Sequence, residues 1–109
     1  LGLLQGTVDV LILKTLSWKP MHGFALSQWI HARTDGVLVL EDAALYQGLH
    51  RLERQGLLRS EWGLSENNRR ARYYRLTPEG ERRRREETAT WRAYAGAVFK
   101  VLDARSAAT

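Results

Sequence analysis

The sequence contains no cysteine and no long uninterrupted run of apolar residues. The absence of cysteine excludes a disulfide scaffold and a thiolate metal site, and it suits a reducing compartment. A helix that spans a bilayer needs about 20 consecutive apolar residues, and no run reaches that length. The apolar start, LGLLQGTVDVLILKTL, lacks the basic n-region and the cleavage site of a signal peptide. We therefore expect a cytoplasmic protein that does not contact membranes.

Motifs for catalysis are also missing. The three histidines, His22, His31 and His50, do not have the spacing of metal ligands. The glycines are dispersed, and no nucleophile lies at a suitable spacing from a base. His22 has two interpretations, a metal ligand or catalytic base and a helix-start residue that bonds locally, and we favour the second. The sequence therefore predicts that the protein is not an enzyme and holds neither a metal nor a cofactor.

The chain does have an excess of positive charge, most of it from arginine. Its 109 residues suffice for one domain, and its formal net charge is +5. A planar guanidinium binds phosphate through two parallel hydrogen bonds, so this composition favours partners that carry phosphate. Charge alone does not establish nucleic-acid binding, because many basic proteins are merely soluble. The positions of the arginines along the chain must therefore show whether they form a surface for nucleic acid.

The segment Glu41–Gln55 is predicted to form a helix with two unlike faces. Apolar residues recur at i, i+4 and i+7 and share one face, namely Leu45, Leu49 and Leu52. The opposite face is small at its start, polar at Gln47 and cationic towards its end. Glutamine can bond a base edge with both its donor and its acceptor, and arginine can hold a phosphate or a guanine. Gly56 supplies the left-handed residue that ends a helix.

Two helices and a short strand are predicted upstream of this segment. The first helix spans Val8–Trp18, with Thr7 as its N-cap, and it is apolar over most of its girth. Such a helix is usually covered on more than one side, so a partner chain is a candidate for the second cover. The second helix begins at His22-Gly23, and Phe24 is expected to pack beneath the first helix. A short β-type run, Val37–Leu40, follows it.

A β-hairpin is predicted directly after the Glu41–Gln55 helix. Its strands are Leu57–Leu64 and Ala71–Leu76, and the polar turn Ser65–Arg70 joins them. Four arginines lie on the turn and the returning strand: Arg69, Arg70, Arg72 and Arg75. They are either scattered charges on a solvated hairpin or a surface for phosphate. Their density, next to two asparagines, favours the second interpretation.

Thr77-Pro78 predicts the start of a last, long helix that runs to about Ala104. The first half of this helix carries four consecutive arginines, but glutamates lie four residues from them. We therefore favour a self-paired, solvated face over a phosphate clamp. The second half carries an apolar stripe, formed by Trp91, Ala95, Val98 and Leu102 with Tyr94 and Val101 beside it.

The order of these elements predicts a mainly α (α+β) fold, a winged helix-turn-helix with a long C-terminal helix. We divide the chain into residues 1–76, the winged domain, and residues 77–109, the last helix and its tail, within one compact unit. In this fold the third helix enters the major groove of double-stranded DNA. The hairpin, or wing, lies along the backbone and reaches towards the adjacent minor groove.

The run LYQGLHRLERQGLL, followed by SEWGLSENNRRARYYRLTPEGE, resembles the PadR family of bacterial transcriptional regulators. The upstream stretches LILKTLSWKPMHGFAL and DGVLVLEDAALY resemble it too, so the similarity covers about Gly6 to Leu102. The short C-terminal part resembles the subgroup with a minimal dimerisation helix. Family members commonly have a proline after the LY pair, where this chain has Gln47, so its preferred DNA sequence is expected to differ. The resemblance implies a homodimeric, usually repressing regulator that reads a pseudo-palindromic operator.

These arguments assign residues to three surfaces. DNA is expected to contact Ala44, Tyr46, Gln47, Arg51, Asn68, Arg69, Arg70 and Arg72. The homodimer interface is expected to contain Leu11, Trp91, Tyr94, Ala95, Val98 and Leu102. Trp91 and Tyr94 have a second interpretation, a pore for a flat aromatic effector, as in relatives with a short last helix. The rival function is a winged helix that binds protein and uses its third helix as structure, and the basic wing argues against it.

Overall fold

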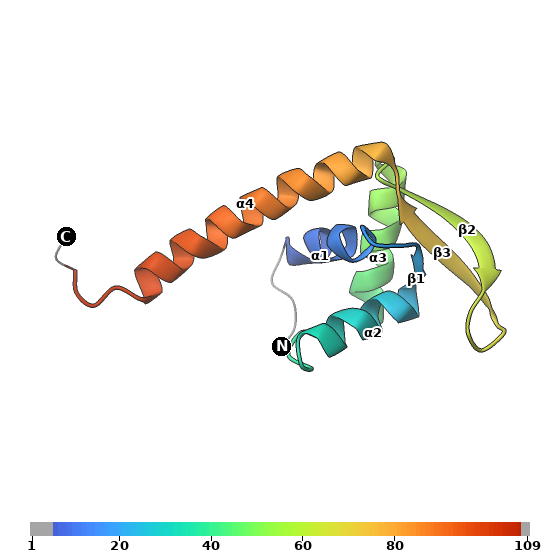
Figure 1. The fold of residues 1–109 in the computed structure, drawn as a ribbon, viewed down its shortest axis with the longest axis horizontal. Helices are drawn as coiled ribbons and strands as arrows, with labels where there is room; N and C mark the ends of the chain where they lie inside the picture. The colour runs from blue at the N-terminus through green and yellow to red at the C-terminus, as the bar shows by residue number, and fades with distance from the viewer. Residues whose placement is uncertain (1–5, 108–109) are drawn as a thin grey trace.

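The computed structural model describes residues 6–107, so residues 1–5 and 108–109 lie outside the described part. The elements follow one another as α1 (Thr7–Thr15), β1 (Met21–His22), α2 (Gly23–Arg33), α3 (Asp42–Arg54), β2 (Leu58–Leu64), β3 (Arg70–Leu76) and α4 (Pro78–Leu102). Figure 1 shows α1, α2 and α3 packed together, with the β2–β3 hairpin projecting on one side and α4 extending far beyond the other. The described chain is accordingly elongated, with extents of 59 × 29 × 22 Å. This confirms the predicted winged helix with a long C-terminal helix.

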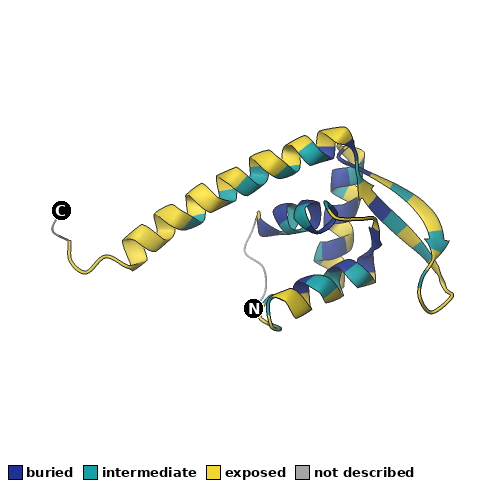
Figure 2. Cartoon of the chain, in the orientation of Figure 1, coloured by how far each residue is buried: buried dark blue, intermediate teal, exposed yellow. Residues whose placement is uncertain are grey.

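The hydrophobic core lies between α1, α2, α3 and the base of the sheet, where Figure 2 shows the buried residues concentrated. The predicted inner face of α3 is confirmed, because Leu45, Leu49 and Leu52 are almost completely buried. They pack with buried residues from every neighbouring element: Ile12, Leu13, Leu26, Ile30, Leu58 and Tyr74. Each buried leucine contributes about 1.5–3 kcal/mol relative to exposure, so this face anchors α3 firmly.

The crossing of α1 and α3 depends on Gly48. A Cβ atom there would lie 2.9 Å from Ile12 Cδ1 and 3.0 Å from Val8 Cγ1. Contacts this short require the neighbouring side chains to shift, so glycine lets the two helices approach closely. Close packing of α1 against the buried side of α3 therefore fixes the position of α3.

The predicted end of α3 and start of α4 are both confirmed, and they are bonded to each other. Gly56 has φ +77°, and its N–H donates to Glu53 O while the Leu57 N–H donates to Leu52 O, which is a Schellman motif. Thr77 caps α4 by accepting from the Gly80 N–H at 3.0 Å. The Thr77 hydroxyl also donates to Gly56 O at 2.7 Å. The end of α3 and the start of α4 therefore meet at one hydrogen-bonded joint, formed by Gly56 and Thr77, and the wing begins and ends there.

The sheet has the order β1-β3-β2, and both pairings are antiparallel. β2 pairs with β3 from Leu58↔Leu76 to Leu64↔Arg70, as the hairpin prediction required. The third strand corrects a prediction. Val37–Leu40 forms no strand, and Met21–His22 pairs with β3 instead. A two-residue strand has too few residues to show a period-2 pattern, and Leu40 is buried without a strand partner.

Three further predictions in the N-terminal half are wrong. The N-cap of α1 is Gly6, in the left-handed region, and Thr7 is the first helical residue; the helix also ends at Thr15 rather than Trp18. Phe24 does not pack beneath α1, because it is 63% exposed in the first turn of α2. The pairing of β1 with β3 turns this end of α2 towards the wing, and Phe24 lines the space between them.

Much of α4 has no cover within the described chain. Its first turn is buried at Gly80, where a Cβ atom would lie 2.0 Å from Leu57 O. Its C-terminal half is largely exposed in Figure 2, and Leu102 is 70% exposed. Trp91 and Ala95 are half-buried. None of the described helices is both long enough and apolar enough to cross a membrane.

Candidate nucleic-acid interface

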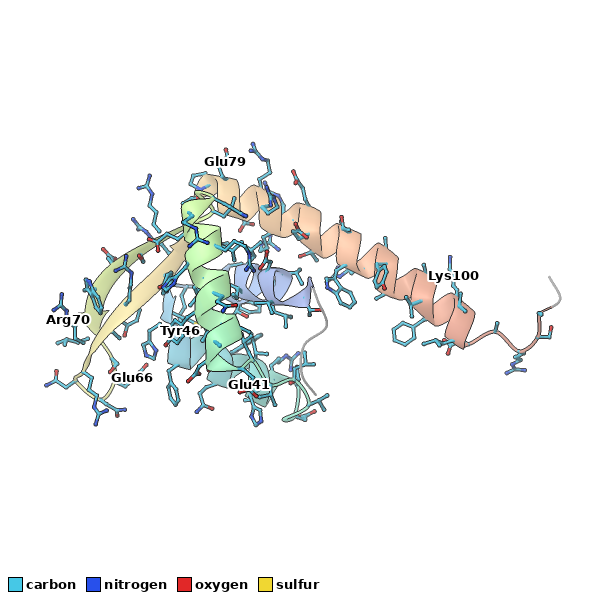
Figure 3. The ribbon with its side chains drawn as sticks, turned by 180° about the vertical axis from the view of Figure 1, so that it is seen from behind. Glu41, Tyr46, Glu66, Arg70, Glu79 and Lys100 are labelled. Atoms are coloured by element: carbon cyan, nitrogen blue, oxygen red, sulfur yellow. The ribbon has the colours of Figure 1, made fainter. Side chains whose placement is uncertain are left out.

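The outer face of α3 presents polar and small side chains to solvent. Ala43, Gln47, His50 and Arg54 are all exposed there. Tyr46 lies at the edge of this face, 42% exposed, and its ring packs over Gly23 at the start of α2. Figure 3 shows Tyr46 on α3 and places Glu66 and Arg70 on the hairpin beside it. The face therefore has a glutamine at its centre and a cation at its C-terminal end.

Two of the α3 residues predicted to contact DNA turn away from the centre of that face. Ala44 is half-buried and packs against the core. Arg51 bends back towards α1, where its Nη2 forms an ion pair with Asp9 Oδ1, and both side chains remain partly exposed. The partner is 42 residues away in the chain, so no local pattern signals this pair.

The inner face of the wing continues the core outwards. Because alternate residues of a strand share one face, buried Leu58 and Tyr74 lie on the same face as Ser60, Trp62, Arg70 and Arg72. Burial raises the pKa of the Tyr74 hydroxyl. The half of the wing nearest the hairpin turn, which we call its outer half, therefore presents Trp62, Arg70 and Arg72 on the side that faces α3.

A hydrogen-bonded bridge fixes this outer half to the end of α3. The Ser60 hydroxyl donates to Glu53 Oε2 at 2.6 Å, and Arg72 Nε donates to Ser60 Oγ at 2.8 Å. Arg72 Nη2 also lies 3.7 Å from Glu53 Oε2. Arg72 was predicted as a DNA contact, and the structure shows that it is also a brace between the wing and α3.

Trp62 was missed by the sequence analysis, although it stands directly opposite Arg72 in the hairpin register. The Arg70 guanidinium carbon lies 4.5 Å from the centre of its ring, and that of Arg72 lies 5.6 Å away. Such contacts are attractive because the ring face is electron-rich. The predicted strand ends, Leu64 and Ala71, would place Trp62 opposite Tyr73, so only the observed register shows a tryptophan across from an arginine.

The hairpin turn is tied to the start of α2. His22 Nδ1 accepts from the Ala25 N–H at 3.1 Å, which confirms the local, helix-capping interpretation of this histidine. Its Nε2 lies 3.4 Å from Glu66 Oε2 in the turn. The pKa of Glu66 lies below its usual range, chiefly because of a hydrogen bond with its own backbone and then because of His22. Asn68 adopts φ +58°, which closes the turn.

The space between α3 and the wing is an open groove of about 580 Å³. Aromatic and cationic side chains line it, among them Phe24, Tyr46, His50, Trp62, Arg69 and Arg70. Within residues 6–107, neither Arg69 nor Arg70 has a carboxylate within 4 Å. No group of three or more potential metal ligands occurs among the same described residues. The aromatic and cationic lining of the groove is therefore suited to an anionic, partly apolar partner.

The arginines of α4 have a different setting, as predicted. Arg82 pairs with Glu79, and Glu81 accepts from Arg84 at 2.6 Å and lies 3.7 Å from Arg85. The Glu81–Arg85 pair has the predicted i, i+4 spacing, whereas Glu79 pairs three residues on and not with Arg83 as expected. The hydrogen bond from Arg84 holds the pKa of Glu81 below its usual range.

Comparison with known proteins agrees with this geometry. A transcriptional regulator from Clostridium thermocellum is 32% identical and superposes with a TM-score of 0.79, covering 88% of this chain and 93% of that chain. A PadR family transcriptional regulator from Eggerthella lenta is 37% identical with a TM-score of 0.73, covering 93% and 86%. A PadR family regulator from Clostridium difficile is 26% identical with a TM-score of 0.73, covering 89% and 99%.

The family description "Transcriptional regulator PadR-like family" matches residues 12–86, which run from within α1 to the first half of α4. This range contains the winged helix, the groove and the capped joint described above. Members of the family are transcriptional regulators and not enzymes. The chain therefore belongs to the PadR-like family of transcriptional regulators.

Proposed function

We propose that this chain represses transcription as a homodimer that binds a pseudo-palindromic DNA operator in the cytoplasm. The observation that supports this most is the pairing of two surfaces: α3 exposes Gln47, and the adjacent wing exposes Arg69 and Arg70. Glutamine can read a base edge in the major groove, while arginines bind phosphates. Ala44, Tyr46, Arg51, Asn68 and Arg72 complete the proposed DNA contacts.

The proposed dimer interface is the apolar half of α4. The chain exposes a row of large apolar side chains there, which is costly for a soluble monomer and typical of an association surface. The interface would contain Leu11 of α1 together with Trp91, Tyr94, Ala95, Val98 and Leu102 of α4. A twofold dimer would hold two α3 helices about one DNA turn, roughly 34 Å, apart.

Selection of bound duplexes from a random pool tests the proposal directly. We expect an inverted repeat whose half-sites lie about one helical turn apart, and light scattering should give twice the chain mass. Gln47→Ala should change the preferred base, whereas Arg70→Ala should weaken binding to all duplexes alike. A chain that stays single at high concentration and ignores every duplex in low salt would be a protein-binding winged helix instead.

We also propose a flat aromatic effector for the α4 interface. Trp91 and Tyr94 meet edge to face, with ring centres 5.9 Å apart and planes at 87°. A planar molecule could insert beside such rings once a second copy closes the site. Fluorescence quenching by aromatic dyes should be lost in Trp91→Phe. Quenching that persists unchanged would come from Trp18, Trp29 or Trp62 and would remove the support for this site.

A further inference from the structure

The groove between α3 and the wing exposes more aromatic surface than phosphate contacts require. Trp62 is 55% exposed and Phe24 is 63% exposed, and both line the groove. Leaving apolar area in water costs about 25 cal/mol per Å², so large exposed rings gathered in one groove indicate a partner surface. Arginine alone would bind phosphate without them.

Trp62 is also held in place. Arg70 covers its ring at 4.5 Å, and Arg72 lies beside it at 5.6 Å. Arg72 is itself fixed by Ser60 and Glu53, which joins the ring indirectly to the end of α3. A rigid ring loses little entropy when it contacts a partner, which favours a role in binding.

The groove offers both kinds of surface that a DNA strand can contact. A sugar–phosphate strand presents an anionic phosphate and then the apolar face of a deoxyribose at each nucleotide. The groove presents guanidinium groups from Arg69 and Arg70 beside the rings of Trp62 and Phe24. Because Arg70 lies beside the Trp62 ring, a phosphate bound by Arg70 would bring the adjoining deoxyribose next to that ring.

We propose that Trp62 packs against a deoxyribose of the DNA strand that passes between α3 and the wing, with Phe24 on the opposite wall. This inference rests on the proposed DNA binding and adds a contact that is independent of both sequence and salt. Phosphate contacts release counterions, so they weaken as salt rises. Packing of a ring on a sugar releases none.

The test measures the dissociation constant of the full chain for two duplexes between about 50 and 200 mM salt. One duplex is the selected operator, and the other has a random sequence. We expect Trp62→Ala to weaken both about five- to tenfold at every salt concentration and to leave the log–log slope unchanged. Trp62→Phe should recover most of the loss.

Two variants serve as controls. Trp18 is 56% exposed, matching Trp62, but lies outside the groove, so Trp18→Ala should not change DNA affinity. Arg70→Ala should instead reduce the slope by about 0.9 for each phosphate that the side chain neutralises in the wild type. If Trp62→Ala changes the log–log salt slope, Trp62 merely positions its arginines and the proposal is wrong.

Two further outcomes separate this inference from the proposed function. If the wild type binds and Trp62→Ala binds equally well, only this inference fails. If the wild type binds neither duplex, the proposed function fails.

Discussion

The turn and returning strand of the wing carry four arginines, as does the first half of α4, yet the two regions place them in opposite settings. In α4, three of the four have glutamate partners about one turn away on the same helix. In the wing, Arg72 is braced, Arg70 stacks on Trp62, and Arg69 has no carboxylate within 4 Å in the described part of the chain. The same number of arginines therefore gives two different surfaces: glutamates offset most of the positive charge on α4, but no carboxylate among the described residues offsets that of Arg69 and Arg70 in the wing.

The cause of the difference is secondary structure. On a helix, residues three and four apart are neighbours, so a sequence with interleaved Glu and Arg pairs with itself. On a two-stranded hairpin, the neighbour of a residue is set by the register across the strands, and here Arg72 stands opposite Trp62 and not opposite a glutamate. Exposed helix pairs add only about 0.3–0.5 kcal/mol each, but they occupy the guanidinium groups. Arg69 and Arg70 of the wing therefore remain available for phosphate, whereas Arg72 is held by Glu53 and Ser60.

The largest expected effect is on stability, from disrupting the joint between the end of α3 and the start of α4, where the wing meets α4. Gly80→Ala would place a Cβ atom 2.0 Å from Leu57 O, a backbone atom that cannot move aside cheaply. We expect the free energy of unfolding to fall by about 3 kcal/mol or more, measured by urea denaturation. Gly96→Ala is the matched control in the same helix, because nothing lies within 4 Å of its added Cβ. That variant should be more stable by about 0.5–1 kcal/mol, and equal losses in both would contradict the close contact at Gly80.

The next effect separates the two arginine groups. A variant with Arg69→Ala and Arg70→Ala should lose DNA affinity strongly, and its log–log salt slope should fall by about 0.9 for each phosphate left without its arginine. A variant with Arg82→Ala and Arg85→Ala removes the same charge from exposed, glutamate-paired positions of α4. Its slope should stay close to that of the wild type. Equal losses would mean that total charge, and not the setting of each arginine, drives binding.

A smaller effect is expected at Arg51, which is paired like the α4 arginines but lies on the DNA-facing helix. Asp9→Asn removes the carboxylate that competes with DNA for the Arg51 guanidinium, so we expect affinity to rise about two- to fivefold with a slope steeper by about 0.9. In an Arg51→Gln background, Asp9→Asn should have no such effect. Weaker binding in Asp9→Asn alone would show instead that the ion pair is needed to orient α3.

The smallest effect concerns acid stability. Glu81 in α4 and Glu66 in the wing turn both have pKa values below the usual range, Glu81 chiefly through Arg84 and Glu66 chiefly through its own backbone. A lowered folded-state pKa contributes stability above the unfolded pKa of about 4.3, and this contribution is lost as pH falls through the folded pKa. Glu81→Gln and Glu66→Gln should therefore be slightly less stable than wild type at pH 7. Each difference should vanish in thermal melts well below pH 4, and a difference that persists there would have another cause.

Local patterns predicted most of the fold correctly because their causes are local. The Leu45, Leu49 and Leu52 face, the glycine at position 56 and the Thr77-Pro78 cap each depend on residues within a few positions of one another. β1 was missed because its pairing with β3 joins residues about 50 positions apart. The same reason explains Phe24, whose exposure follows from how α2 meets the wing.

The features of the candidate site also divide into those that the sequence indicated and those that depend on tertiary contacts. The sequence indicated a polar outer face on α3 and an arginine-rich wing, since both follow from spacing along one element. It did not indicate that Arg51 pairs with Asp9, that Arg72 braces the wing against Glu53, or that Trp62 lies between arginines in the groove.

The amino-acid sequence by itself determined the four helices, the β2–β3 hairpin, the end of α3 and the start of α4, because capping, turn geometry and periodicity act over a few residues. Only the tertiary structure decided which guanidinium groups are held by carboxylates and which remain open. That outcome depends on which side chains packing brings within about 4 Å, where ion pairing becomes strong enough to fix a side chain.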